Sequence, residues 1–155
     1  MRSAAGVAIV VLLTLSLSLG CGRKGPRPVP VSGTVTVDGK PLAGGAITVA
    51  PEKGRAAGGR IGTDGRFVLS TWVQGDGVAP GTHRVEVIAS KPLPGNRRQW
   101  LVPKKVRSLA TSPLRLEVTG PTTGAMIAIE TGGETLEIES LDGGTVDEGL
   151  YLSKP

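Results

Sequence analysis

Apolar and polar residues alternate with a period of two along much of this chain. In the run VSGTVTV at 31–37, the valines and Gly33 share one face, and a serine and two threonines share the other. This period is typical of a β-strand that buries one of its faces. The pair Asp38-Gly39 follows directly and predicts a tight turn, because glycine adopts positive φ without steric cost.

Similar runs recur and are separated by turns rich in glycine, proline and aspartate. They predict strands at 46–50, on either side of an Asp-Gly turn within 60–69, and at 82–89, 114–118, 125–130 and 134–141. Residues 51–59 read as a loop, and residues 91–113, with four prolines and no sustained period, as a long excursion. No segment has helical periodicity of useful length. We therefore expect an all-β fold, a single β-sandwich.

The alternation also predicts which side chains form the core. Aromatic residues are only 3% of the sequence, so the core should be mainly aliphatic. The residues expected to face it are Val35, Val37, Ile47, Val49, Phe67, Leu69, Val85, Val87, Leu116 and Val118.

The N-terminal part has the pattern of an export signal. An apolar run of 14 residues, 6–19, follows Arg2 and precedes Gly20, whereas a membrane-spanning helix needs about 20 apolar residues. Cys21 follows and is the only cysteine, so no disulfide can form within the chain. There are two alternatives here. One is a signal peptide that is cleaved before a modified Cys21, and the other is an ordinary signal peptide with an incidental cysteine.

The segment Ser18-Leu19-Gly20-Cys21 resembles the lipobox of bacterial lipoproteins. Gly20 and Cys21 fit that pattern, while Ser18 and Leu19 depart from it. The resemblance implies cleavage before Cys21 and attachment of acyl chains such as palmitate to it, and Gly22 resembles the pattern exported to the outer membrane. We expect a signal peptide at 1–20, a basic Pro/Gly-rich linker at 21–30, a β-sandwich domain at 31–141 and a tail at 142–155.

Three segments of the predicted domain resemble the carboxypeptidase regulatory-like domain, a transthyretin-like β-sandwich found in small bacterial lipoproteins. They are 31–49, Thr63-Asp-Gly-Arg-Phe67 and Pro80-Gly-Thr-His-Arg-Val85, and 100–116 resembles the late segment of those lipoproteins. The sequence departs from the family at His83 and in its longer C-terminal part. The resemblance implies a single transthyretin-like or Ig-like β-sandwich of about seven strands. It also implies a non-catalytic accessory module of the cell envelope and no particular ligand.

The residue inventory argues against most enzyme classes. With one histidine, the chain cannot build a zinc site from two histidines and a glutamate. The related hydrolases need several histidines, and the related dioxygenases need two Tyr and two His on iron. We expect no cofactor and no metal. The alternatives are a transthyretin-like enzyme of hydrolase or dioxygenase type, His83 pairing with Asp64 or Asp76 to activate a serine, and a secreted domain without a lipid anchor.

The net charge of +5 conceals an asymmetry. Residues 23–116 hold 16 Lys/Arg and 5 Asp/Glu, a net charge of +11, while residues 117–155 hold 1 and 8, a net charge of −7. The two parts should therefore attract each other in the fold. Nucleic acid is not an expected partner, because an exported chain rarely meets it.

The excursion at 91–113 contains the candidate contact site. Its members are six cations and one tryptophan: Lys91, Arg97, Arg98, Trp100, Lys104, Lys105 and Arg107. A positive loop with a central aromatic residue suits an anionic surface, such as lipopolysaccharide phosphates, an acidic polysaccharide or an acidic envelope protein. The alternative is a solvated loop whose Trp100 folds back onto the sandwich.

Overall fold

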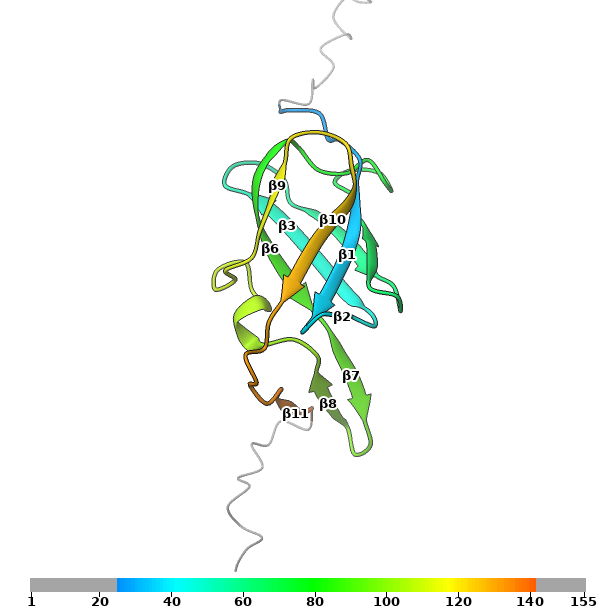
Figure 1. The fold of residues 1–155 in the computed structure, drawn as a ribbon, viewed down its shortest axis with the longest axis vertical. Helices are drawn as coiled ribbons and strands as arrows, with labels where there is room; N and C mark the ends of the chain where they lie inside the picture. Colours follow the sequence, from blue (N-terminus) through cyan, green and yellow to red (C-terminus); the bar gives the residue numbers. More distant parts are fainter. Residues whose placement is uncertain (1–24, 142–155) are drawn as a thin grey trace, which may run out of the picture.

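The computed structural model describes residues 25–141, and this segment is all-β, which confirms the predicted fold class (Figure 1). The predictions for the signal peptide, Cys21 and the tail at 142–155 concern residues outside it. A 3₁₀-helix, η2, covers Lys104–Val106, and no helix between residues 25 and 141 is long and apolar enough to cross a membrane. The strands are β1 (Val31–Val37), β2 (Lys40–Pro41), β3 (Gly45–Pro51), β4 (Ala57–Ile61), β5 (Arg66–Val68), β6 (Gly81–Ile88), β7 (Ser90–Leu93), β8 (Arg97–Trp100), β9 (Arg115–Val118), β10 (Thr122–Ile129) and β11 (Ile138–Ser140).

Most of these strands form one sheet that curls into a sandwich. Its order is β10-β1-β5-β4-β3-β6-β9, with β2 paired to β1. Figure 1 shows β1 and β10 lying across β3 and β6, so two parts of the same sheet enclose the core. Strands β1 and β10 run parallel, and the other paired strands of the described segment are antiparallel.

The parallel pair depends on a glycine. Gly33 lies opposite Ala125, next to an irregularity in the register. A Cβ atom on Gly33 would overlap the carbonyl oxygen of Ala125. Glycine is therefore required where the β10 backbone approaches β1 most closely.

The core matches the period-two prediction closely. Nine of the ten residues expected there are buried, and the tenth, Val37, is half-buried and packs against the core margin. Phe67 is the one aromatic residue among the buried apolar side chains of the described segment, and the others are aliphatic. The turn at Asp38-Gly39 has positive φ at Gly39, as predicted, and also at Asp38.

The prediction of a loop at 51–59 is wrong at both ends, since β3 ends at Pro51 and β4 begins at Ala57. Ala57 is buried and pairs with Val49, and Gly58 and Gly59 continue the ladder with β3. Two adjacent glycines carry no side-chain alternation, so the period that reveals a strand is missing from this sequence.

The prediction that residues 91–113 form an irregular excursion is also wrong. They contain the β7–β8 hairpin, which turns at Gly95 and Asn96 with positive φ at both, and then η2. Proline is compatible with β7 because this is an edge strand of its sheet, where an N–H group is not needed on the outer side. Val102 and Val106 are buried, so the segment around η2 completes the core.

The ends of the domain also differ from the prediction. Of the strand expected at 134–141, only Ile138–Ser140 is extended and paired, and its partner is β8. At the other end, order begins before Val31, because Val29 and Val78 exchange backbone hydrogen bonds of 2.9 and 3.1 Å.

Candidate contact surface

The predicted contact residues lie on and beside a second, small sheet. This sheet has the order β11-β8-β7, and β7 begins two residues after β6 ends. Figure 1 shows it projecting from the lower end of the domain, opposite the end where the described chain begins. The structure therefore brings residues from the basic segment together with residues from the acidic C-terminal part.

Trp100 is the centre of a cluster on this sheet. The guanidinium carbons of Arg98 and Arg107 lie 4.7 and 4.1 Å from the centroid of its rings, within the range of cation–π attraction. The indole Nε1 donates a hydrogen bond of 3.0 Å to Glu139 Oε2. Trp100 is half-buried in these contacts, so it serves the internal structure of the sheet rather than standing open as an anchor for a partner.

Two glutamates complete the cluster. Arg98 Nε lies 3.0 Å from Glu139 Oε2, and Arg107 Nη1 lies 2.8 Å from Glu137 Oε2. Arg107 Nε also donates to the carbonyl oxygen of Val102 at 3.1 Å, and its side chain is only 11% exposed. The segment 91–107 contains no acid of its own, but the fold supplies two from residues more than 25 positions away.

The ionisation of Glu139 reflects this environment. Its pKa lies below the usual glutamate value, chiefly because Arg98 donates a hydrogen bond to it and, to a smaller extent, because Trp100 does. Partial desolvation opposes this shift, and the charges of Arg98 and Arg107 add to it. Glu139 is therefore a carboxylate held in its charged form by the two arginines and the indole.

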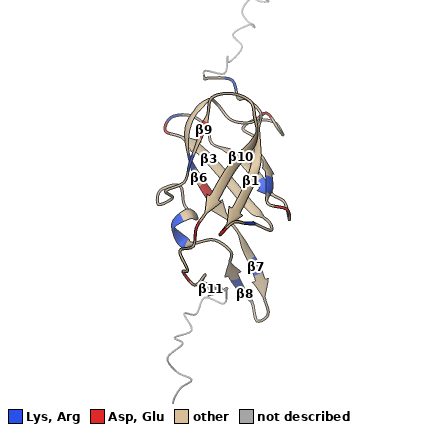
Figure 2. Ribbon diagram, viewed as in Figure 1, with Lys and Arg blue, Asp and Glu red and all other residues tan. Residues whose placement is uncertain are grey.

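The other four cations of the candidate site are exposed. Lys91 lies on β7, and Arg97 begins β8, with its Nε donating to the carbonyl oxygen of Pro94 at 3.1 Å. Lys104 and Lys105 form the exposed part of η2, which Figure 2 shows in blue. None of these four has an ion-pair partner within residues 25–141. The predicted site thus divides into two structural arginines and four cations that are free to meet an anion.

The lone histidine belongs to the core. His83 is fully buried on the inner face of β6, and its Nε2 lies 2.7 Å from the carbonyl oxygen of Ala79. Its Nδ1 has no hydrogen-bond partner in the described part of the chain. Asp76 accepts hydrogen bonds from the backbone N–H groups of Thr71, Trp72 and Val73. Among the contacts of residues 25–141, the alternative in which His83 pairs with Asp64 or Asp76 is not formed.

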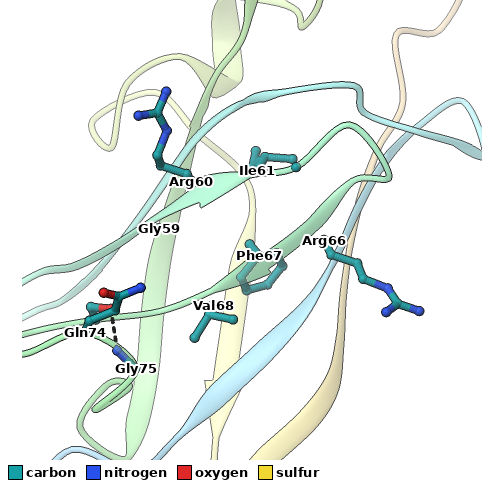
Figure 3. Close-up of a pocket in the computed structure, with 10 residues that line it drawn as sticks. Gly59, Arg60, Ile61, Arg66, Phe67, Val68, Gln74 and Gly75 are labelled. Carbon is teal, nitrogen blue, oxygen red and sulfur yellow. Dashed lines mark hydrogen bonds between the residues drawn. The ribbon is translucent and has the colours of Figure 1, made fainter.

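A shallow groove of about 880 Å³ lies over β4 and β5 (Figure 3). Ile61 and Phe67, which are paired across β4 and β5, are among its lining residues, and Arg60 and Arg66 point away from each other. At one end of the groove, the Gly75 N–H donates a hydrogen bond to Ser70 Oγ, so these two polar groups already bond to each other. No group of three or more metal-ligating side chains occurs in the described segment. The groove therefore lacks converging polar groups that would orient a ligand.

Sequence reasoning missed two features. The first is the contribution of Glu137 and Glu139, for which only the charge asymmetry gave a general signal. The second is a cluster at the opposite end of the domain, where Trp72 and Val73 are exposed beside Lys53 and Arg55. Its signal was an apolar pair inside a turn-rich segment.

No protein-family model, curated protein or solved structure matches this chain. The lipoprotein and the carboxypeptidase regulatory-like interpretations therefore remain predictions from the residues that carry them.

Proposed function

We propose that this protein is a lipid-anchored, non-catalytic binding module of the cell envelope. In this proposal an acylated Cys21 holds it to a membrane, and the domain presents the small sheet to a partner. The exposed cations Lys91, Arg97, Lys104 and Lys105 would attract an anionic partner, such as an acidic polysaccharide, lipopolysaccharide or an acidic envelope protein.

One observation carries the proposal. The described chain begins at one end of the long axis and the small sheet lies at the other (Figure 1). A module anchored just before residue 25 would therefore hold its small sheet at the end far from the anchor. Two or more acyl chains anchor a protein stably, whereas one binds only marginally.

The anchor is tested by replacing the cysteine. We expect the wild-type protein to enter the detergent phase after phase separation, and the Cys21→Ala variant to move to the aqueous phase. Mass spectrometry of the mature N-terminus should find Cys21 as the first residue, carrying acyl groups. A Ser18→Ala variant is the matched control, because it changes the preceding segment and leaves the cysteine. Equal partitioning of the wild type and Cys21→Ala would contradict the proposal.

A further inference from the structure

The end of the domain where the described chain begins exposes two large apolar side chains. Trp72 is 49% exposed and Val73 is 64% exposed, although Phe67 and Leu69, shortly before them in the chain, are buried in the core. They border a groove of about 700 Å³ whose other walls include residues 25–28, Pro51 and residues 53–55. The first described residues of the chain therefore pass directly beside this apolar pair.

Cations surround the pair. Arg27, Lys53 and Arg55 line the same groove. The guanidinium carbon of Arg55 lies 4.4 Å from the ring centroid of Trp72, and its Nε donates to the carbonyl oxygen of Thr71 at 3.1 Å. Arg55 is thus held against the aromatic ring with its charge at the surface.

Two acids lie in the same region and reduce its charge. Glu52 is exposed in the 51–55 turn, and Asp76 lines the groove. Counting these against the three cations leaves a net charge of +1, to which Arg23 and Lys24 add two further positive charges in the sequence. Charge alone would attract an anionic surface weakly, so binding to such a surface would also require burial of the apolar pair, Trp72 and Val73.

The loop that carries Trp72 and Val73 is organised by its own hydrogen bonds. Asp76 Oδ1 accepts from the Thr71 N–H at 2.7 Å, and Asp76 Oδ2 accepts from the N–H groups of Trp72 and Val73 at 3.0 and 3.2 Å. Thr71 Oγ1 donates to the carbonyl oxygen of Gly77 at 2.7 Å. The loop is therefore preformed with its two apolar side chains outward, and little ordering is needed when they leave water.

We propose that this surface, formed by Arg27, Lys53, Arg55, Trp72 and Val73, docks on the headgroup region of the membrane that holds the acylated cysteine. This inference rests on the proposed lipid anchor. Three residues lie between Cys21 and Gly25, and the four residue-to-residue steps span at most about 14 Å when fully extended. The anchor therefore keeps this surface within reach of the bilayer.

The chemistry of the surface fits a bilayer better than a protein partner. Tryptophan favours the boundary between headgroups and acyl chains, because its ring is apolar and its N–H is polar. Lysine and arginine next to it are attracted to anionic headgroups by about 1 kcal/mol each near the surface. An exposed tryptophan, an exposed valine and three cations beside the chain that leads to the anchor form such an interface.

The two tryptophans allow a direct test, since the chain has only Trp72 and Trp100. The full mature protein would be incorporated into vesicles of phosphatidylglycerol and phosphatidylethanolamine that carry a nitroxide-labelled lipid near the headgroups. The Trp100→Phe variant reports on Trp72, and Trp72→Phe reports on Trp100. Relative to unlabelled vesicles, we expect the nitroxide to reduce Trp72 emission by about twofold or more, because the ring would lie at the boundary between headgroups and acyl chains. Trp100 emission should stay unchanged.

Further variants show which groups act. Lys53→Ser with Arg55→Ser, in the Trp100→Phe background, should reduce the quenching of Trp72, and Val73→Ser should do the same. Met126→Ser is the matched control, because Met126 is 73% exposed on β10, away from this groove, and its loss should change nothing.

The outcomes separate the two proposals. If the protein floats with the vesicles and Trp72 emission equals that in unlabelled vesicles, the anchor stands and the docking surface is overturned. If both tryptophans are quenched equally, the specific orientation is overturned. If mass spectrometry finds no acyl group, the proposed anchor fails. The docking surface is then tested independently, by mixing the unacylated full chain with the same vesicles and measuring Trp72 emission. Quenching of Trp72 would then support it, and its absence would overturn it.

Discussion

The indole Nε1 of Trp100 donates a hydrogen bond of 3.0 Å to Glu139, 39 residues further along the chain. This contact joins β8 to the last described strand. It also connects the two oppositely charged parts of the sequence, because Trp100 lies in the basic segment and Glu139 in the acidic one. The small sheet is therefore stabilised by side chains whose relationship is visible only after folding.

Neutralising Glu139 should loosen the small sheet. A Glu139→Gln variant keeps an oxygen that can accept from Trp100 but loses the ionic partner of Arg98. We expect faster amide hydrogen exchange at Trp100, whose N–H donates to the carbonyl oxygen of Glu137. Glu134→Gln is the control, since Glu134 is exposed in a turn and has no ion pair within the described segment. Identical exchange in both variants would show that the cluster does not hold the sheet.

The same carboxylate should make the small sheet sensitive to acid. The pKa of Glu139 is lower in the folded protein than in the unfolded chain, chiefly because of the hydrogen bond from Arg98. Its stabilising effect is therefore complete above the ordinary glutamate pKa of about 4.3 and is lost as pH falls through the lower folded-state pKa. Trp100 fluorescence, followed in the Trp72→Phe background, should show a transition below about 4.3 that Glu139→Gln abolishes. An unchanged transition in that variant would assign it to another group.

Much of the main sheet could be predicted because its strands bury one face and therefore alternate. Strands β1, β3, β6 and β9 lie close to the predicted ranges. The small sheet could not be found in this way. Its strands SKPL and RRQW have few buried side chains, so they carry no apolar period, and their pairing depends on a turn at Gly95-Asn96.

The candidate site was predicted only in part, for a related reason. Composition identified the cations and Trp100, because charge is a property of single residues. Which cations remain exposed depends on contacts between β8, η2 and β11, which are distant in sequence. Arg98 and Arg107 could therefore be separated from Lys91, Arg97, Lys104 and Lys105 only from the structure.

The shape of the Arg107 side chain should matter as well as its charge. Its guanidinium group contacts Val102, Glu137 and the ring of Trp100 at once. A lysine cannot make these three contacts with one ammonium group. We expect Arg107→Lys to lower the free energy of unfolding by about 1–2 kcal/mol in urea denaturation. Arg97→Lys, on an exposed side chain of the same sheet, should be close to neutral, and a similar loss in both would contradict this role.

Phe67 should be the most sensitive position of the core. It is 2% exposed on β5, between β1 and β4, and is the largest buried side chain of that strand. Truncating Phe67 to alanine should cost about 3–5 kcal/mol, through lost burial and a remaining cavity. The neighbouring Val68→Ala is the matched control, because Val68 is 53% exposed, and its cost should stay within about 0.5 kcal/mol. A loss below about 1 kcal/mol for Phe67→Ala would be too small for a fully packed core position.

The four exposed cations should carry any binding to an anionic partner. Replacing Lys91, Arg97, Lys104 and Lys105 with serine removes four positive charges and leaves the Trp100 cluster intact. Replacing Arg98 instead would remove the partner of Glu139 and disturb the sheet itself.

We therefore expect the quadruple variant to lose binding to lipopolysaccharide or to an acidic polysaccharide, with little change in thermal stability. Wild-type binding should weaken with salt, as the screening length falls from about 10 Å at 0.1 M to about 3 Å at 1 M. The control replaces Lys40 and Arg60 with serine, since both are exposed and lie on the main sheet. Titration of immobilised polysaccharide over a range of salt concentrations measures both effects. Binding that is insensitive to salt, or equally weakened in the control, would show that the small sheet is not the contact surface.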